Sequence, residues 1–135
     1  MALAARKLTS DIVTRLADVP PFSMNGVTIY GLATPSRGAR QVEVWLSRME
    51  SEAETPIHSH SAEEVIVVLR GRGEARLIGK ETVTFEAPCT LVLPALELHQ
   101  ISNTGREILE LIANIPAASK IFDERGIEMM LPWRE

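Results

Sequence analysis

The sequence predicts an all-β fold, built as an antiparallel sandwich or barrel in one domain. From Val27 onward the chain contains eight or so short apolar segments at regular spacing, which is typical of strands. Glycine and proline residues separate these segments, as turns in an antiparallel sheet require. The chain has 135 residues, 45% of them apolar, which is enough for one domain with a hydrophobic core.

The N-terminal region differs from the rest. Apolar residues recur at helix-like spacing between residues 1 and 18, and Pro20-Pro21 ends this pattern. We expect residues 1–20 to form an arm that packs on the domain or on a neighbouring chain, and residues 21–135 to form the β domain. One helical turn is expected in addition, either near residues 123–125 or at the extreme C-terminus.

The strands are expected in a regular order. Residues 27–32 form the first, and a turn at residues 35–38 leads to the second, residues 41–49. Residues 74–85 predict a hairpin with Gly79-Lys80 as its two-residue turn. The other expected strands are residues 65–69, 90–93, 100–102 and 108–115. Both faces of residues 65–69 are apolar, which predicts a strand buried on both sides.

A metal site is predicted where the chain reads TPIHSHSAEEVIVVLRG. His58 and His60 are two residues apart, so in a strand their imidazoles point to the same face and can share one ion. Glu64 begins the apolar strand, where a buried carboxylate needs a positive partner. The chain has three histidines, and His99 is the third. We therefore predict a divalent metal ion held by His58, His60, Glu64 and His99.

Composition excludes several classes of function. The net charge of −4 provides no basic surface for nucleic acid, and no apolar stretch has the length of a membrane helix. The first residues are too polar for a secretory signal. Cys89 is the single cysteine, so no internal disulfide can form, and its apolar surroundings predict a buried, inert thiol. We expect a cytoplasmic protein.

Two segments resemble the motifs of the cupin superfamily. The first is His58-x-His60-x₃-Glu64-x₆-Gly71, and the second is Pro94-x₄-His99-x₃-Asn103. This resemblance implies a jelly-roll barrel, also called a double-stranded β-helix. The chain departs from the motifs at Glu52, Pro88 and Leu96, where cupins usually have glycine.

A closer resemblance covers roughly residues 10 to 133. The segments QVEVWLS, TPIHSHSAEEVIVVLRGRG and HQISNTG, and the KIF and PW of the tail, look like the plant auxin-binding proteins, which are small dimeric cupins. In that family three histidines and one glutamate hold zinc, and the zinc takes the carboxylate of indole-3-acetic acid. The resemblance therefore implies a zinc site at the four predicted ligands, a small carboxylate as ligand, and a homodimer.

The resemblance also implies a ligand pocket. The family's pocket residues fall at Trp45, Thr55, Pro56, Ile121 and Trp133. Trp45 shares its strand face with Glu43 and Ser47, opposite the apolar face of Val42, Val44 and Leu46, which favours the pocket over the core. Trp133 has an alternative role, as a plug of the barrel mouth or a dimer contact.

The predicted pocket is less aromatic than that of the family. Ser47 stands where the family has glutamine, and Ile66 and Leu131 stand where aromatic residues are expected. The pocket remains apolar, with Thr55 and Ser47 as sources of a hydroxyl group.

The main hypothesis is a metal-dependent binding protein for a small aromatic, auxin-like carboxylic acid. Three histidines and one glutamate suit zinc, and also Mn, Fe, Ni or Co. The alternative is a metal-dependent oxygenase or isomerase acting on a similar acid. A third hypothesis is a structural metal site in an interaction module. No general base or nucleophile accompanies the metal ligands, because every histidine is already assigned to the metal, and this favours binding over hydrolysis.

Overall fold

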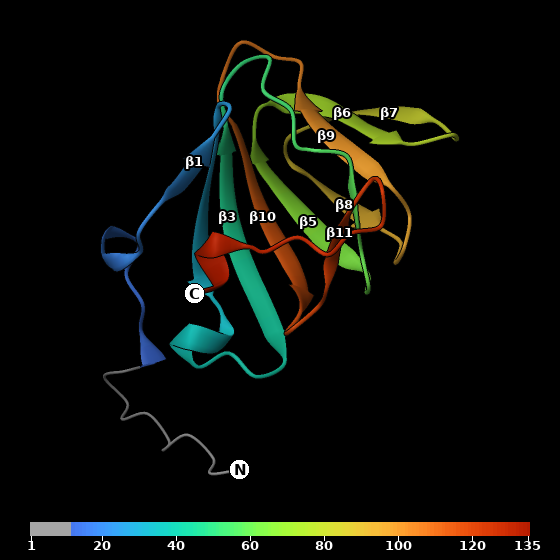
Figure 1. Ribbon diagram of the computed structural model, residues 1–135. Coiled ribbons are helices and arrows are strands. Elements are labelled where there is room, and N and C mark those ends of the chain that lie inside the picture. The colour runs from blue at the N-terminus through green and yellow to red at the C-terminus, as the bar shows by residue number, and fades with distance from the viewer. Residues whose placement is uncertain (1–11) are drawn as a thin grey trace.

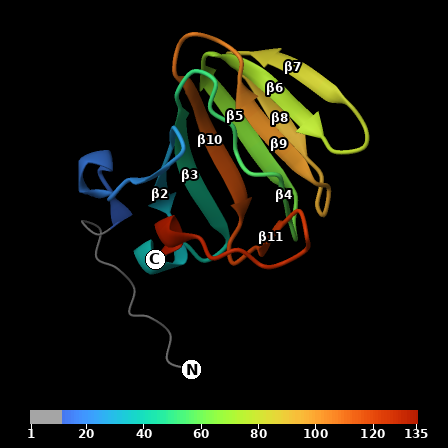
Figure 2. The ribbon, with the colours of Figure 1, turned by 45° about the horizontal axis from the view of Figure 1, so that its top comes forward.

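Two antiparallel sheets pack face to face in the computed structural model, which describes residues 12–135 (Figures 1 and 2). Strands in the larger sheet follow the order β1-β2-β3-β10-β5-β8, and those in the smaller sheet the order β11-β4-β9-β6-β7. Neighbouring strands come from distant parts of the chain, as in a jelly roll. The predicted all-β fold class is confirmed.

The described residues form eleven strands rather than about eight. The larger sheet contains β1 (Phe22–Met24), β2 (Val27–Ala33), β3 (Val42–Met49), β5 (Glu64–Arg70), β8 (Cys89–Leu93) and β10 (Leu109–Pro116). The smaller sheet contains β4 (His58–His60), β6 (Arg72–Leu77), β7 (Thr82–Glu86), β9 (His99–Asn103) and β11 (Ile121–Asp123). Sequence reasoning missed β1 and β11, because three residues are too few to show an alternating pattern.

Three short 3₁₀ turns lie wholly within the described residues: Leu16–Asp18, Pro35–Arg37 and Pro132–Arg134. The last is the helical turn expected at the C-terminus. Residues 1–11 of the expected arm lie outside the described part of the chain, and Ile12 and Val13, which follow them, are exposed. None of the residues described here forms a helix of the length and apolarity needed to cross a membrane.

The core lies between the two sheets. Strand β10 directs Leu109, Leu111, Ala113 and Ile115 inward, and all four are buried. Strand β5 directs Glu64, Ile66 and Val68 inward, as their common face predicted.

The outer face of β5 contradicts one expectation. Val67 is 36% exposed and Leu69 is 49% exposed, so the prediction of a strand buried on both sides is wrong. Residues 12–135 leave this face of the larger sheet partly uncovered at Val67 and Leu69. Branched aliphatic residues favour strands whether or not they are buried, which is why their pattern alone did not decide burial.

The inward face of β3 is the one that looks more polar in sequence. Glu43 is fully buried and Trp45 is 5% exposed, whereas Val42, on the opposite face, is 52% exposed. The buried Glu43 carboxylate pairs with Arg134 near the C-terminus. A charge can therefore lie on the inner face because a distant residue neutralises it.

Turn geometry explains several motif positions. Gly71 has φ +90°, and a Cβ there would lie 2.8 Å from the carbonyl oxygen of Ile108. Glu52 and Leu96, which replace motif glycines, still adopt positive φ angles of 70° and 64°. The backbone thus keeps the left-handed conformation that glycine adopts most easily.

Two further residues have structural roles. Asn103 is buried and donates hydrogen bonds to the carbonyl oxygens of Met49 (2.9 Å) and Glu107 (2.8 Å), which ties β9 to β3. Cys89 is half-buried and packs against the core, so its expected burial is only partial.

Candidate metal centre and binding cavity

The three histidines meet at one place between the sheets. His58 and His60 lie on β4, and His99 lies directly opposite His58 on the neighbouring strand β9. The ring centroids are 4.4 Å apart for His58 and His99, and 4.8 Å apart for His60 and His99. One ligand nitrogen from each ring lies within 4.8 Å of those of the other two. Two strands adjacent in space thus bring together residues some forty positions apart in sequence.

Backbone carbonyls orient two of the imidazoles. In the neutral rings, Nδ1–H of His58 donates to the carbonyl of Pro56 at 2.6 Å, and Nδ1–H of His99 donates to that of Glu97 at 3.0 Å. Each bond fixes a tautomer that leaves the Nε2 lone pair free, as metal-binding histidines require. The Nε2 atom of His99 is buried and has no hydrogen-bond partner among residues 12–135.

Glu64 reaches the same place from the opposite sheet. It begins β5, its side chain is 6% exposed, and its carboxylate oxygen lies 3.7 Å from His60 Nδ1 and 3.9 Å from His99 Nε2. Two atoms each about 2.1 Å from one tetrahedral zinc ion are about 3.4 Å apart, so these separations are close to those of shared ligands.

Burial governs the protonation of the four groups. It lowers the pKa of His58 to about 4, with a further decrease from the nearby His99, and it also lowers the pKa of His60 and His99. Burial raises the pKa of Glu64 to about 8. At neutral pH and without metal, all four groups are therefore mostly uncharged, and the three imidazoles offer lone pairs without first losing a proton.

These residues fit a divalent metal ion. Three neutral imidazoles and one carboxylate form a donor set of the kind that binds zinc and other divalent transition metals. The unpartnered nitrogen of His99 and the uncompensated burial of Glu64 are both explained if a cation lies between them.

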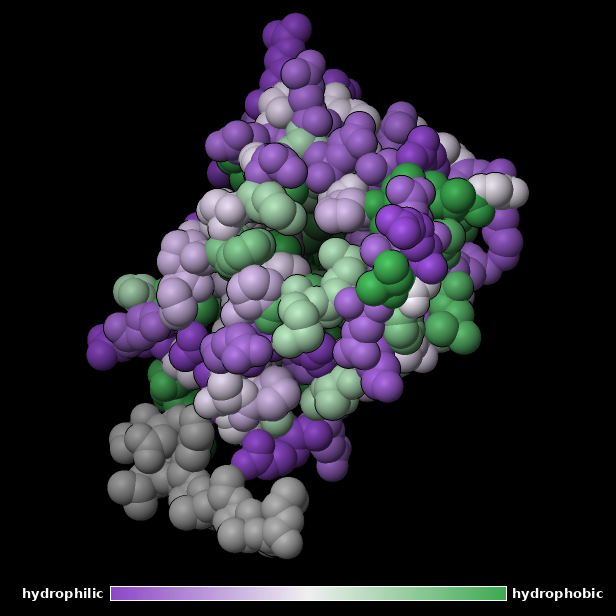
Figure 3. Space-filling model, in the orientation of Figure 1, coloured by the Kyte–Doolittle hydropathy of each residue, from purple (hydrophilic) through white to green (hydrophobic). Residues whose placement is uncertain are grey.

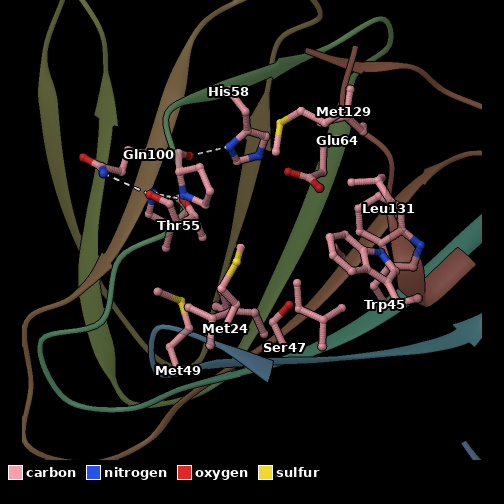
Figure 4. Close-up of a pocket in the computed structure, with 18 of the residues that line it drawn as sticks. Met24, Trp45, Ser47, Met49, Thr55, His58, Glu64, Gln100, Met129 and Leu131 are labelled. Carbon is pink, nitrogen blue, oxygen red and sulfur yellow. Dashed lines mark hydrogen bonds between the residues drawn. The ribbon is translucent and has the colours of Figure 1, made fainter. Parts of the chain in front are cut away.

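A cavity of about 450 Å³ extends from the four predicted ligands along the interior of the barrel. Figure 4 shows His58 and Glu64 at one end, with Trp45, Ser47 and Leu131 around the rest of the space. The surface is hollowed near the centre of the face shown in Figure 3, and hydrophobic residues gather around the hollow. The volume is in the range of small-molecule sites.

All the sequence-predicted pocket residues line this cavity: Trp45, Ser47, Thr55, Pro56, Ile66, Ile121, Leu131 and Trp133. The Thr55 hydroxyl oxygen already accepts a hydrogen bond from the Ile101 N–H at 3.0 Å. Trp133 packs edge-on against Trp45, with ring centroids 5.4 Å apart. The Nε1 atom of Trp133 is buried and has no hydrogen-bond partner in the described part of the chain.

Sequence reasoning missed a group of methionines in the wall. Met24, Met49, Met129 and Met130 all line the cavity. Met49 could have been found, because it lies on the same face of β3 as Trp45 and Ser47. The others come from β1 and from the C-terminal segment, where the sequence shows no strand pattern. Methionine is flexible and polarisable, so this wall can adapt to the shape of a ligand.

Comparison with known proteins identifies relatives over most of the chain. The sequence profile of the family described as "Auxin binding protein" matches residues 6–129. Auxin-binding protein 1 of Arabidopsis thaliana is 36% identical over 118 residues, covering 77% of this chain and 58% of that protein. Auxin-binding protein 4 of Zea mays is 32% identical, covering 66% of this chain and 50% of its own length. The chain thus matches about half the length of these curated relatives.

Solved structures support the fold. The polyketide cyclase RemF of Streptomyces resistomycificus superposes with a TM-score of 0.70 at 17% identity, covering 90% of this chain and 88% of that one. An oxalate decarboxylase of Bacillus subtilis superposes with a TM-score of 0.73 at 18% identity, covering 82% of this chain and 31% of that one. A cupin-like protein of Thermotoga maritima superposes with a TM-score of 0.61 at 25% identity, covering 65% of this chain and 66% of that one.

The jelly-roll architecture and the family match agree with each other. The two cupin motifs lie on β4, β5 and β9, where the histidines and Glu64 converge. The chain belongs to the auxin-binding protein family of cupins.

Proposed function

We propose that this protein binds a divalent metal ion, zinc in the first place, and through it a small aromatic carboxylic acid of the auxin type. One observation carries the proposal: three neutral imidazoles, of which His60 and His99 are buried, and a buried carboxylic acid converge at one end of an apolar cavity. Relatives at 29–36% identity are named auxin-binding proteins, which supports the ligand class.

His58, His60, His99 and Glu64 are the proposed metal ligands. Their nitrogen and oxygen donors also suit manganese, iron, nickel or cobalt, and a structural neighbour, the oxalate decarboxylase of Bacillus subtilis, is described with Mn(II) centres. When bound here, the metal supplies a positive charge and an open coordination position for a carboxylate.

The cavity wall would bury the apolar part of the acid. Trp45, Ile66 and Leu131 are each at most 6% exposed and present apolar surface to the cavity. Ser47 brings a hydroxyl group into the same space (Figure 4). A ligand with one acidic end and one apolar end therefore matches the division of the cavity into a polar end and an apolar remainder.

Assembly as a homodimer is part of the proposal. Val67, Leu69 and Val92 lie on the outer face of β5 and β8 and are 36%, 49% and 58% exposed. Contiguous apolar residues on a sheet face favour contact with another chain. We also propose a cytoplasmic location, which the single cysteine supports because no internal disulfide is needed.

The test is elemental analysis of the purified protein, followed by calorimetric titration of the zinc-loaded form with indole-3-acetate. We expect one metal ion per chain and binding of the acid that disappears after metal removal. The His58→Ala variant should lose the metal. Ser59→Ala serves as the matched control, because Ser59 lies on the same strand and is buried but is not a proposed ligand.

Two results would contradict this function. Full metal content in His58→Ala would show that the ligands are wrongly assigned. Iron in the purified protein, together with oxygen uptake on addition of an organic acid, would favour the alternative of an oxygenase. Structural neighbours that are enzymes share the fold at 16–18% identity and do not decide between the two.

A further inference from the structure

The C-terminal segment, residues 128–135, forms one wall of the cavity although most of it lies outside the two sheets. We call it the tail segment. Met129, Leu131 and Trp133 line the cavity, and Leu131 is only 6% exposed despite its place near the chain end. Figure 1 shows this red segment crossing in front of β3 and β10, and Figure 4 shows Leu131 pointing into the same space as Glu64. The tail segment thus separates the cavity from solvent on this side.

A backbone contact seats the tail segment at each end. At its start, the Met129 N–H donates to the carbonyl of Ile121 at 2.8 Å, which joins it to β11. Near its end, the Trp133 carbonyl packs on Gly31 of β2 so closely that a Cβ on Gly31 would lie 2.0 Å from the carbonyl oxygen. The second seat exists only because residue 31 has no side chain.

An ion pair holds the end of the tail segment in place. The Arg134 guanidinium binds the Glu43 carboxylate through both oxygens, with Nε–Oε1 2.9 Å and Nη2–Oε2 2.5 Å. Its Nη1 donates to the carbonyl of Ser119 at 2.9 Å. Glu43 is fully buried, and Arg134 is 20% exposed at its side chain. Burial raises the pKa of Glu43, but the hydrogen bonds from Arg134 and from the Ala118 N–H lower it more, so the carboxyl is ionised.

The same carboxylate is linked to the cavity wall. Trp45 Nε1–H donates to Glu43 Oε1 at 3.2 Å, and the Trp45 ring contacts the edge of Trp133. The Arg134 guanidinium lies 6.0 Å from the centre of the Trp45 ring. One buried carboxylate therefore fixes a cavity residue on β3 and, through Arg134, the end of the tail segment.

We propose that the Glu43–Arg134 ion pair is a latch that holds the tail segment over the cavity and sets the rate at which ligand enters and leaves. This rests on the proposed function, which places the ligand in that cavity. Opening the latch leaves the buried Glu43 carboxylate without its cationic partner, so the closed state dominates. Arg134 acts as a positioning residue, through Leu131 and Trp133, and touches neither metal nor ligand itself.

Two substitutions unseat the tail segment in independent ways. Arg134→Ala removes the ion pair, and Gly31→Ala places a methyl group against the Trp133 carbonyl without changing any charge. The control is Arg48→Ala, which removes an arginine on β3 whose Nε lies 2.9 Å from Glu110 on the partly exposed side of the sheet, away from the tail segment. Arg134→Lys keeps the positive charge but loses the two-point contact with Glu43. Its ligand dissociation rate should therefore lie between those of the wild type and Arg134→Ala.

The measurement is the dissociation rate of indole-3-acetate from the zinc-loaded protein by stopped-flow displacement. We expect Arg134→Ala and Gly31→Ala each to raise this rate by on the order of tenfold, since loss of a buried charge pair acts mainly on dissociation. The zinc content of all these variants should stay unchanged. The rate of ligand dissociation from Arg48→Ala should equal that of the wild type. Amide hydrogen exchange of residues 129–135 should accelerate by a similar factor in the two tail variants and not in the control.

The outcomes separate this inference from the proposed function. If the wild-type protein binds zinc and indole-3-acetate but both tail variants release the acid at the wild-type rate, the latch is refuted. If the wild-type protein binds neither, the proposed function fails, and hydrogen exchange of residues 129–135 then decides the latch: equal exchange in Arg134→Ala and wild type refutes it. Loss of zinc in Arg134→Ala would also refute it, because the effect would then not be confined to the tail segment.

Discussion

Zinc binding should release close to one proton per chain at neutral pH, and Glu64 should be its source. Metals bind the carboxylate and the neutral imidazole, so any proton on a ligand must leave. Burial raises the pKa of Glu64 to about 8, which keeps this carboxyl protonated in the metal-free protein. Burial lowers the pKa of His58 to about 4 and shifts the pKa of His60 and of His99 in the same direction, so the imidazoles are mostly neutral at pH 7 and contribute little to the release.

The expected number of protons released on zinc binding is nearly independent of pH between pH 6 and pH 7. A group with a pKa of about 8 is protonated to about 0.99 at pH 6 and about 0.9 at pH 7, so release should stay near one proton. Three exposed histidines with pKa values of about 6.5 would instead release about 2.3 protons at pH 6 and about 0.7 at pH 7. The apparent zinc affinity should accordingly rise about tenfold per pH unit from pH 6 to pH 7 and level off above pH 8.

Calorimetric titration with zinc in buffers of different ionisation enthalpy counts the released protons. Measurements at pH 6 are the most discriminating, because a metal-bound water with a pKa near 7 or above then contributes little. Glu64→Gln should bring the count close to zero, and the matched control Glu63→Gln, which alters the exposed neighbouring carboxyl, should not. Release of two or more protons at pH 6, or unchanged release in Glu64→Gln, would refute the reasoning.

Three further predictions concern stability and assembly. In the metal-free protein, the raised pKa of Glu64 means that the folded state binds more protons than the unfolded state, so its contribution to stability is lost as pH rises toward 8. The histidines act in the opposite direction, but only below about pH 6.5. The melting temperature should therefore decrease as the pH rises from 6.5 to 8. This decrease should be smaller in Glu64→Gln and in the presence of excess zinc. Leu96→Gly, at an exposed site with φ 64°, should raise the free energy of unfolding by roughly 0.5–1 kcal/mol, and denaturant titration showing a decrease would contradict this. Leu69→Lys on the outer sheet face should shift sedimentation from dimer to monomer, and an unchanged dimer would place the interface elsewhere.

The convergence of the histidines and Glu64 was predictable from sequence because most of its signal is local. A two-residue spacing fixes a common strand face for His58 and His60, and a carboxylate at the start of an apolar strand needs a partner. The position of His99 was added by elimination and by the cupin motif. The structure brings all four together, with His58 and His99 directly opposite each other.

Other features could not be predicted, because they depend on contacts across the whole chain. Glu43 looks like a solvent-facing residue until its partner is known, and Arg134 is 91 positions away. The exposure of Val67 depends on what covers the sheet, and side-chain type carries no information about that. The short strands β1 and β11 form because longer neighbours offer them hydrogen-bonding edges.

Under the proposed function, metal binding and ligand selection therefore depend on different parts of the sequence. The metal end of the cavity follows from short motifs that cupins with unrelated activities can share. The rest of the cavity wall includes Met24, Met49 and the tail segment, which carries Met129 and Met130 and is seated by Gly31 and the Glu43–Arg134 pair. If the proposed function holds, we expect a substitution in the tail segment to change which acid fits, or how long it stays, and to leave the metal site intact. Cupin motifs alone predict the metal ligands, whereas we expect the identity of the proposed ligand to depend on the residues of this adaptable wall.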